Sequence, residues 1–327
     1  MQDHPFAHFL RILGKGRQGS RDLSREEAHD AVTLILQGQA TDVQIGAFLL
    51  LLRVKDESAD ELAGMLQACR AFSTPLDLDC TIDWPSYAGK RKHLPWFLLA
   101  AKCLSQEGIK IFMHGSPVSE DRLATRDVLH NLGITHVTQA ASARQQLQNH
   151  GLVYMDLCDF HPRLNELIAL RPQLGVRTPM HSLVRLLNPS SAQHALVPIF
   201  HPAYRSRHLA ALIAAGDTQV TIFKGEGGEA ERNPDGLLKT EGLRLGTPYE
   251  ETWPPMSSER QPSESMADLH HLKALWRGEL EQPYGALACV GTMALVLRTL
   301  EPAKDMDSAL QRAQQLWDDR DRNALQA

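Results

Sequence analysis

The sequence predicts an α/β protein with a small helical lobe ahead of a larger, doubly wound and mostly parallel α/β lobe. Helical periodicity runs through residues 1–75, and beyond Pro75 short apolar runs alternate with amphipathic helices. Of the 327 residues, 43% are hydrophobic and 22% charged, which allows a large buried core. We place the helical lobe at 1–75 and the α/β lobe with its C-terminal helices at 76–327. A helical segment near 163–190 is expected to return to the first lobe.

The helical lobe is predicted from capping residues followed by apolar residues at helical spacing. Ser24-Arg25-Glu26-Glu27 resembles a capping box, and Gly38 ends the helix that follows it. Asp42 and Ser58 are expected to cap two further helices. Residues 14–21 form a glycine-rich, cationic loop between the first two helices.

The second lobe is predicted from strands that alternate with helices. Strands are expected at 81–83, 109–113, 152–155 and 220–223. Helices are expected at 94–104, 122–132, 171–187, 265–276, 286–300 and 307–318. The segment 247–265 is rich in Pro, Ser and Glu and is interpreted as an acidic surface loop.

The cysteines and apolar runs bear on localisation. Five widely separated cysteines without a CxxC pair argue against a disulfide framework and against a zinc knuckle. The start shows no signal-peptide pattern, and we expect no apolar run to approach the ~18 residues of a membrane span. We therefore expect a cytoplasmic protein without a membrane partner.

The charge is segregated along the chain, although the net charge is only −5. Residues 226–281 hold twelve acidic and six basic side chains, whereas residues 84–126 hold seven basic and three acidic ones. Residues 160–210 hold six basic side chains and one acidic. A chain with a basic face binds polyanions despite an acidic total, because charges are screened over about 8 to 10 Å. The alternative is that these charges only solvate helix surfaces.

Three segments resemble one known family. Gln44–Glu57, with Glu61-Leu62-Ala63-Gly64, is similar to the N-terminal helical signature of anthranilate phosphoribosyltransferase, and Met113-His114-Gly115 resembles its KHG turn. Arg171–Pro189 is similar to its RxxLGxRTxFNxLGPLxNP block. The resemblance spans roughly residues 5 to 230 and identifies a member of the anthranilate phosphoribosyltransferase-like family (glycosyltransferase family 3). It implies a nucleoside phosphorylase/phosphoribosyltransferase-like fold, a cleft between the lobes, and a homodimer made through the helical lobe.

The family's pyrophosphate loop is altered here. Its GTGGD sequence, which wraps the pyrophosphate of phosphoribosyl pyrophosphate with backbone N–H groups, corresponds to residues 85–92, Pro-Ser-Tyr-Ala-Gly-Lys-Arg-Lys. A close pyrophosphate nest is not expected from a single glycine. The Ser86–Lys92 loop instead resembles a divergent paralogue subfamily that binds nucleic acid.

The family's magnesium-binding Asp-Glu pair falls at Ala230-Glu231, so one carboxylate is missing. Losing the loop and half of the dyad removes the groups that neutralise the leaving pyrophosphate. Ordinary transferase activity is therefore doubted, no cofactor is expected, and no catalytic residue is assigned. If the chain is an enzyme, the resemblance implies roles for His114 and Arg171, with magnesium on Glu226, Glu229 and Glu231.

The preferred prediction is non-specific binding of a DNA or RNA backbone by a homodimer. The predicted phosphate-binding residues are Lys15, Arg17, Arg21, Lys90, Arg91, Lys92, Arg126, Arg163, Arg205 and Arg207. The first alternative is a glycosyl or phosphoribosyl transferase that uses phosphoribosyl pyrophosphate with an altered acceptor. A second alternative is a regulatory protein that binds a nucleotide in the cleft between the two lobes that the family resemblance implies.

Overall fold

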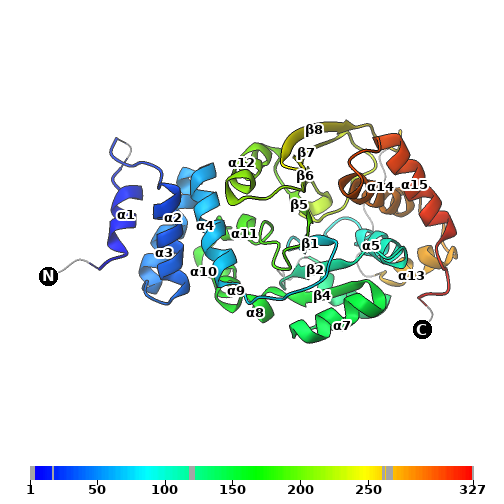
Figure 1. Cartoon of the computed structure of the whole chain (residues 1–327), viewed down its shortest axis with the longest axis horizontal. Coiled ribbons are helices and arrows are strands. Elements are labelled where there is room, and N and C mark those ends of the chain that lie inside the picture. Colours follow the sequence, from blue (N-terminus) through cyan, green and yellow to red (C-terminus); the bar gives the residue numbers. More distant parts are fainter. Residues whose placement is uncertain (1–3, 17, 118–121, 260–261, 263–267, 326–327) are drawn as a thin grey trace.

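Four helices form one end of the elongated molecule, and a mixed sheet flanked by helices forms the rest (Figure 1). The computed structural model describes residues 4–16, 18–117, 122–259, 262 and 268–325. The helices of the first lobe are α1 (Ala7–Leu13), α2 (Arg25–Leu36), α3 (Asp42–Lys55) and α4 (Ala59–Phe72).

Side-chain caps set where these helices begin. Ser24 and Ser58 each accept a hydrogen bond from the backbone N–H three residues on, and each capping box closes with a glutamate, which confirms both predicted caps. The cap of α3 is Thr41, so the predicted Asp42 cap was wrong by one residue. Asp42 instead lies in the first turn, where its charge favours the positive end of the helix dipole.

The second lobe is built on one eight-stranded sheet with the order β3-β4-β2-β1-β5-β6-β7-β8. The first six strands in that order are parallel, and β7 and β8 are antiparallel to their neighbours. The strands are β1 (Ile82–Ser86), β2 (Ile111–Gly115), β3 (His136–Val137), β4 (Leu152–Asp156), β5 (His194–Ile199), β6 (Val220–Lys224), β7 (Leu238–Arg244) and β8 (Thr247–Trp253). The fold is therefore the predicted helical lobe joined to a mostly parallel α/β lobe.

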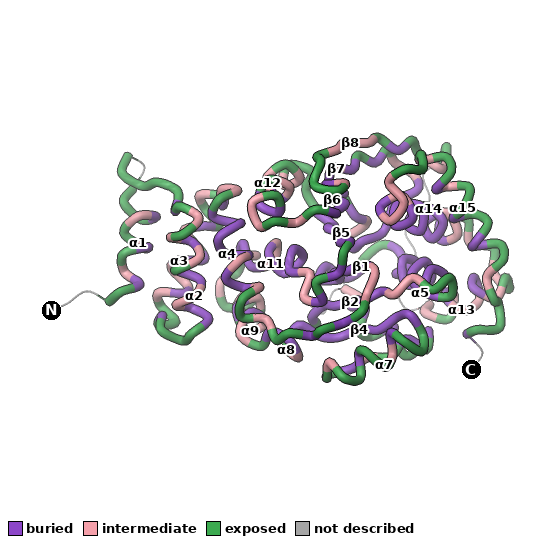
Figure 2. The backbone as a smooth tube through the Cα atoms, viewed as in Figure 1, coloured by how far each residue is buried: buried purple, intermediate pink, exposed green. Residues whose placement is uncertain are grey.

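The two faces of the sheet bury two separate cores. Figure 2 shows buried stretches both in the sheet and in the helices that flank it. Successive strand residues alternate between them: Phe112 and Val153 belong to one core, and Met113 and Tyr154 to the other. The first core continues into the helical lobe, which makes the two lobes parts of one packed structure.

Helices cover both faces of the sheet. The core shared with the helical lobe is closed by α7 (Ala140–His150), α8 (Leu157–Phe160), α9 (Pro162–Ala169), α11 (Met180–Leu183) and α12 (Arg205–Ala215). The other core is closed by α5 (Phe97–Gln106), α6 (Thr125–Val128), α13 (His270–Arg277), α14 (Pro283–Leu300) and α15 (Met306–Asp319). The short α10 (Arg171–Leu174) lies between α9 and α11.

The segment predicted as an acidic loop after Thr247 begins as strand β8, so that prediction was wrong. β7 and β8 form a hairpin in which Leu238 pairs with Trp253 and Arg244 pairs with Thr247. Leu245 and Gly246 turn the chain, both at positive φ. Only the stretch after Trp253 is without a strand, and residues 260–261 and 263–267 lie outside the described part.

One described helix, α14, has the length and composition of a membrane span, which the sequence analysis overlooked. In the structure, 78% of it is buried against the sheet and its neighbours. Its apolar surface is therefore used by the core of this lobe.

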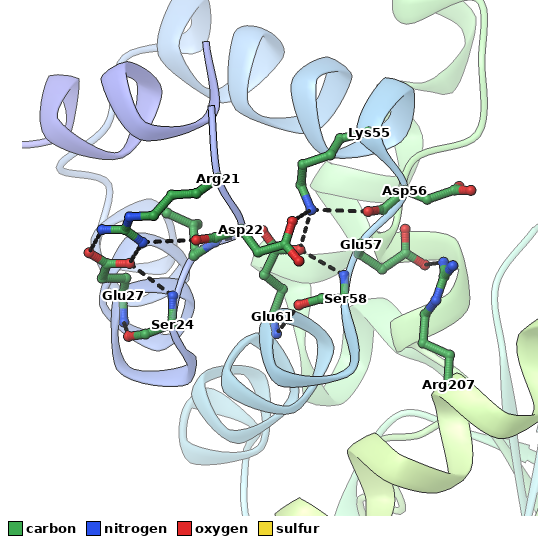
Figure 3. Close-up of polar contacts among 11 residues, drawn as sticks. Arg21, Asp22, Ser24, Glu27, Lys55, Asp56, Glu57, Ser58, Glu61 and Arg207 are labelled. Carbon is green, nitrogen blue, oxygen red and sulfur yellow. Dashed lines mark hydrogen bonds and ion pairs between the residues drawn. The ribbon is translucent and has the colours of Figure 1, made fainter. Parts of the chain in front are cut away.

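The segment between β4 and β5, together with α12 after β5, joins the two lobes. Arg163 donates a hydrogen bond to the Ile35 carbonyl (3.4 Å), and α4 packs against both α11 and α12. Arg207 of α12 reaches Glu57 of the helical lobe at 3.9 Å (Figure 3). Nearby, the buried carboxylate of Glu61 accepts hydrogen bonds from the Leu23 and Ser58 N–H groups and pairs with Lys55.

Candidate functional site

The carboxyl ends of the central parallel strands meet at one edge of the sheet. β1 ends at Ser86, β2 at Gly115 and β6 at Lys224, and the chain leaves the sheet at each of these points. Ligands of open α/β sheets bind at this edge, in the crevice outside the strand ends.

The loop after β1 encloses the carboxylate of Glu229, which lies in the loop after β6. Glu229 Oε1 accepts hydrogen bonds from the N–H groups of Ala88 (2.6 Å) and Gly89 (2.5 Å), and Oε2 accepts one from Ser86 Oγ (2.6 Å). Gly89 has φ +68°, a conformation that lets successive N–H groups converge on one anion. The loop therefore forms a small anion-binding nest, and the protein's own carboxylate fills it.

Lys90 is buried and pairs with Glu231, so its ammonium cannot reach a surface ligand and its assignment as a phosphate contact was wrong. The Lys90 Nζ lies 2.5 Å from Glu231 Oε1 and the residue is 1% exposed. The other carboxylate oxygen accepts the N–H of Phe97, the first residue of α5 (2.9 Å). Burial raises the pKa of Glu231, and the Lys90 ammonium opposes that rise.

The three glutamates proposed for magnesium do not converge. Glu229 and Glu231 point into separate buried hydrogen-bond networks, and Glu226 accepts from the Asn233 amide (2.9 Å). Hard cations need several oxygens aimed at one point, so this arrangement does not favour the magnesium site that the enzyme alternative would place on these residues.

A cavity of about 650 Å³ opens beside this nest. It is lined by Tyr87 from the nest loop and by residues of α9 to α11, among them Arg171, Arg177, His181 and Arg185. None of the described residues that line it carries a carboxylate. The retained Arg171 therefore lies in the wall of a cationic cavity.

Burial sets the charges of this cavity. It lowers the pKa of His181 to about 4, assisted by the nearby Arg177, so that imidazole is neutral at physiological pH. Burial also lowers the pKa of Arg185, which the attraction of Glu229 opposes. The positive charge is that of the three arginines.

His114 lies beneath the cavity, with no exposed surface. Its Nδ1 is 2.7 Å from the Tyr87 hydroxyl, and its Nε2 is 3.1 Å from Asp83 Oδ2. Burial raises the pKa of Tyr87 well above its usual value, so the phenol keeps its proton and shares a hydrogen bond with Nδ1. His114 therefore orients Tyr87 and is not itself a group that touches a ligand in the cavity.

The other predicted phosphate contacts are distributed over the surface. Lys15, Arg91 and Lys92 are exposed, and Arg17 lies outside the described residues. The following cations form ion pairs: Arg21 with Glu27, Arg126 with Asp156, Arg163 with Glu166, Arg205 with Glu241, and Arg207 with Glu57.

Arg126 contacts the one group of potential metal ligands found among the described residues, which is His136, Asp156 and Asp159. His136 Nε2 lies 3.3 Å from Asp156 Oδ2 and 3.9 Å from Asp159 Oδ2. Arg126 already donates to Asp156 Oδ2 (2.6 Å), so an internal cation neutralises that carboxylate.

Two important residues escaped the sequence analysis. Arg122 donates to the carbonyls of Ala88 (3.2 Å), Gly89 (3.1 Å) and Gly227 (3.3 Å), and so joins the two loops of the nest. Neither Arg122 nor Arg185 matches a family motif, so the sequence alone did not single them out. Arg185 was only one of the six basic residues counted between positions 160 and 210.

This two-lobed fold, with its cleft at the carboxyl ends of a mostly parallel sheet, defines a phosphoribosyltransferase-like protein. Residues 8–73 match the helical bundle domain of a glycosyl transferase family, and residues 97–242 match the a/b domain of that family. The chain belongs to the anthranilate phosphoribosyltransferase-like glycosyltransferase family 3.

Similar proteins include an uncharacterized protein, YbiB, of Escherichia coli (strain K12). It is 30% identical over 253 residues, covering 73% of this chain and 78% of that protein. The anthranilate phosphoribosyltransferase of Methylocella silvestris is 30% identical over 237 residues, covering 72% and 68%. The crystal structure of the anthranilate phosphoribosyltransferase from Thermus thermophilus superposes with a TM-score of 0.77 at 20% identity over 94% of both chains, which shows the shared fold.

Proposed function

We propose that this protein binds DNA or RNA through the phosphate backbone, on a transferase scaffold that no longer binds pyrophosphate. The observation that supports this proposal most is the position of the Glu229 carboxylate inside the loop after β1. A pyrophosphate would have to displace a buried carboxylate from three short hydrogen bonds. Phosphoribosyl transfer depends on binding the leaving group, so a filled nest disfavours that chemistry.

The cavity supports an anionic ligand. Arg171, Arg177 and Arg185 line it, and a phosphate entering it would gain charge-assisted hydrogen bonds. The exposed Arg91 and Lys92 follow Tyr87, which lines the cavity, by only four and five residues. Arg91 is therefore within about 14 Å of Tyr87 along the chain. The cavity arginines together with Arg91 and Lys92 thus extend over more than one phosphate, which favours a nucleic-acid backbone over a single phosphate ion as the ligand.

The paired surface cations contribute to such binding as well. Exposed ion pairs are worth about 0 to 1 kcal/mol, so a polyanion can recruit Arg21 at low cost. Each phosphate that is neutralised also releases condensed counterions. The amino-acid sequence shows no motif that reads base edges. We therefore propose that binding is independent of the nucleotide sequence.

We also propose a homodimer through the helical lobe, in the cytoplasm. Val43, Leu50 and Val54 on α3 are 83%, 37% and 85% exposed. Spacings of seven and eleven residues place them on one helix face, and a second copy of the chain would bury this stripe. All five cysteines are free thiols, as a reducing compartment would maintain.

The test compares two ligands on the same protein. Phosphoribosyl pyrophosphate with magnesium is expected to leave the Tm unchanged, whereas a labelled oligonucleotide is expected to bind in a fluorescence anisotropy titration. The R91E/K92E variant should bind the oligonucleotide more weakly than a matched K304E/R312E variant, which changes the net charge equally on the segment around α15. Equal binding by the two variants would show that Arg91 and Lys92 do not contribute to oligonucleotide binding.

The second candidate is a transferase with an altered acceptor, for which magnesium would be required. The observation that favours it is Arg171, which lines a cavity large enough for a small carboxylate substrate. Under this alternative, phosphoribosyl pyrophosphate with magnesium would raise the Tm through ligand binding. An absence of oligonucleotide binding together with that rise would replace our proposal with this one.

A further inference from the structure

Three side chains that can bind a metal ion meet at the carboxyl ends of β3 and β4. His136 lies in β3, Asp156 ends β4, and Asp159 follows in α8. The two strands are parallel neighbours, with His136 opposite Tyr154, so both leave the sheet at the same edge. The pairing of these strands therefore brings one imidazole to two carboxylates.

The ligand atoms have the spacing that a single ion requires. His136 Nε2 lies 3.3 Å from Asp156 Oδ2 and 3.9 Å from Asp159 Oδ2, and all three atoms lie within 4.8 Å of one another. Nitrogen and oxygen ligands bind zinc at about 2.0–2.2 Å, so two atoms on the same ion are about 3 to 4 Å apart. One ion can therefore contact all three side chains with little movement of the backbone.

Hydrogen bonding does not account for the position of the imidazole. The Nε2 atom of His136 is closed off from solvent and makes no hydrogen bond within the described part of the chain, although it faces two carboxylates. A buried polar atom without a hydrogen bond is uncommon and often marks the place of a ligand or an ion. The His136 and Asp159 side chains are 27% and 21% exposed, so an ion can reach the cluster from solvent.

Two neighbours hold the carboxylate of Asp156. The Tyr154 hydroxyl donates to Oδ1 (3.1 Å), and both residues are buried. Hydrogen bonds of this kind orient the carboxylates that bind metals. Arg126 donates to Oδ2 (2.6 Å), and its side chain is 46% exposed. The guanidinium can therefore turn into the solvent and leave Oδ2 to another cation.

We propose that His136, Asp156 and Asp159 bind a divalent transition-metal ion such as Zn²⁺, and that Arg126 competes with this ion for Asp156. Imidazole is a ligand that zinc accepts readily, whereas Mg²⁺ prefers an octahedron of oxygens. An imidazole that binds a metal is neutral, so the two carboxylates balance the divalent charge once Arg126 has turned away. Three protein ligands leave a coordination position for water, as in open zinc sites.

The experiment measures Zn²⁺ binding to the full chain by isothermal titration calorimetry after dialysis against a chelator. It compares the wild type with H136Q/D159N and with the matched control H130Q/D127N, which removes an exposed histidine and an exposed aspartate. The wild type and the control are expected to bind one Zn²⁺ ion more per chain than H136Q/D159N. Excess Mg²⁺ should not compete, and R126Q should bind Zn²⁺ severalfold more tightly than the wild type.

Absorption spectroscopy with Co²⁺ gives an independent measurement, because a bound Co²⁺ ion should produce a visible band that H136Q/D159N lacks. Circular dichroism checks the fold, and D159N alone replaces the double variant if that variant does not fold. Equal Zn²⁺ stoichiometry in the wild type and the folded variant would overturn the site. An unchanged affinity of R126Q would contradict the competition by Arg126. These titrations contain no nucleic acid, so their outcome is independent of oligonucleotide binding.

Discussion

The Gly89 N–H donates to the Glu229 carboxylate at 2.5 Å, and this contact joins the loop after β1 to the loop after β6. β1 and β6 both border β5 in the sheet, so their carboxyl ends lie close together. The family resemblance implies that a substrate pyrophosphate occupies this nest. In this chain the Glu229 carboxylate occupies the nest, and this is why we propose an anion bound by exposed side chains in place of a small diphosphate.

Lys90→Met is predicted to destabilise the fold. It leaves the Glu231 carboxylate buried without its partner, and breaking such a pair costs about 3–5 kcal/mol. The double variant K90M/E231Q should recover part of that loss, because the glutamine carbonyl still accepts the Phe97 N–H while no buried charge remains. Urea unfolding measures both, with K92M as the exposed control. A loss for K90M no larger than for K92M would contradict the buried pair.

Val43→Glu together with Val54→Glu is predicted to convert the proposed dimer into a monomer. Both side chains lie on the exposed face of α3, so the charges should leave the fold intact and repel the second copy. Light scattering after size exclusion gives the mass, and circular dichroism checks the fold. A wild type that is already monomeric would refute the homodimer.

Stability is predicted to fall as the pH is lowered from about 6.5 toward 4. Burial lowers the pKa of His161 and His181 to about 4 and of His208 to about 3. In this pH window the unfolded chain binds protons at these positions and the native protein does not, so acid favours unfolding. H208Q should lose less stability than the wild type between pH 7 and pH 4.5, whereas H201Q, with an exposed ring, should follow the wild type. Identical pH dependence of H208Q and the wild type would contradict the role of His208.

The helical lobe and the alternation of strands and helices were predictable from the sequence because caps and periodicity are local signals. Ser24 and Ser58 show this, since each cap is completed within three residues. The β7–β8 hairpin was missed because Pro248 and the charged residues of β8 are not typical of a strand. β8 is an edge strand of the sheet, where such residues are tolerated.

The site was harder to predict because its geometry depends on residues far apart in the chain. Glu229 and Ser86 are 143 positions apart, and Lys90 and Glu231 are 141. A run of three cations gives no sign that its first member points inward. Only the distant carboxylate, Glu231, determines that Lys90 is structural while Arg91 and Lys92 remain at the surface.

The most direct test of the account is the salt dependence of oligonucleotide binding by the wild-type protein, measured by fluorescence anisotropy at 50 and 200 mM salt. If six or more phosphates are contacted, affinity should fall by about 10³-fold over this range, with no preference among sequences. Absence of binding at 50 mM, or an affinity that does not change with salt, would contradict the proposal that this scaffold binds the nucleic-acid backbone.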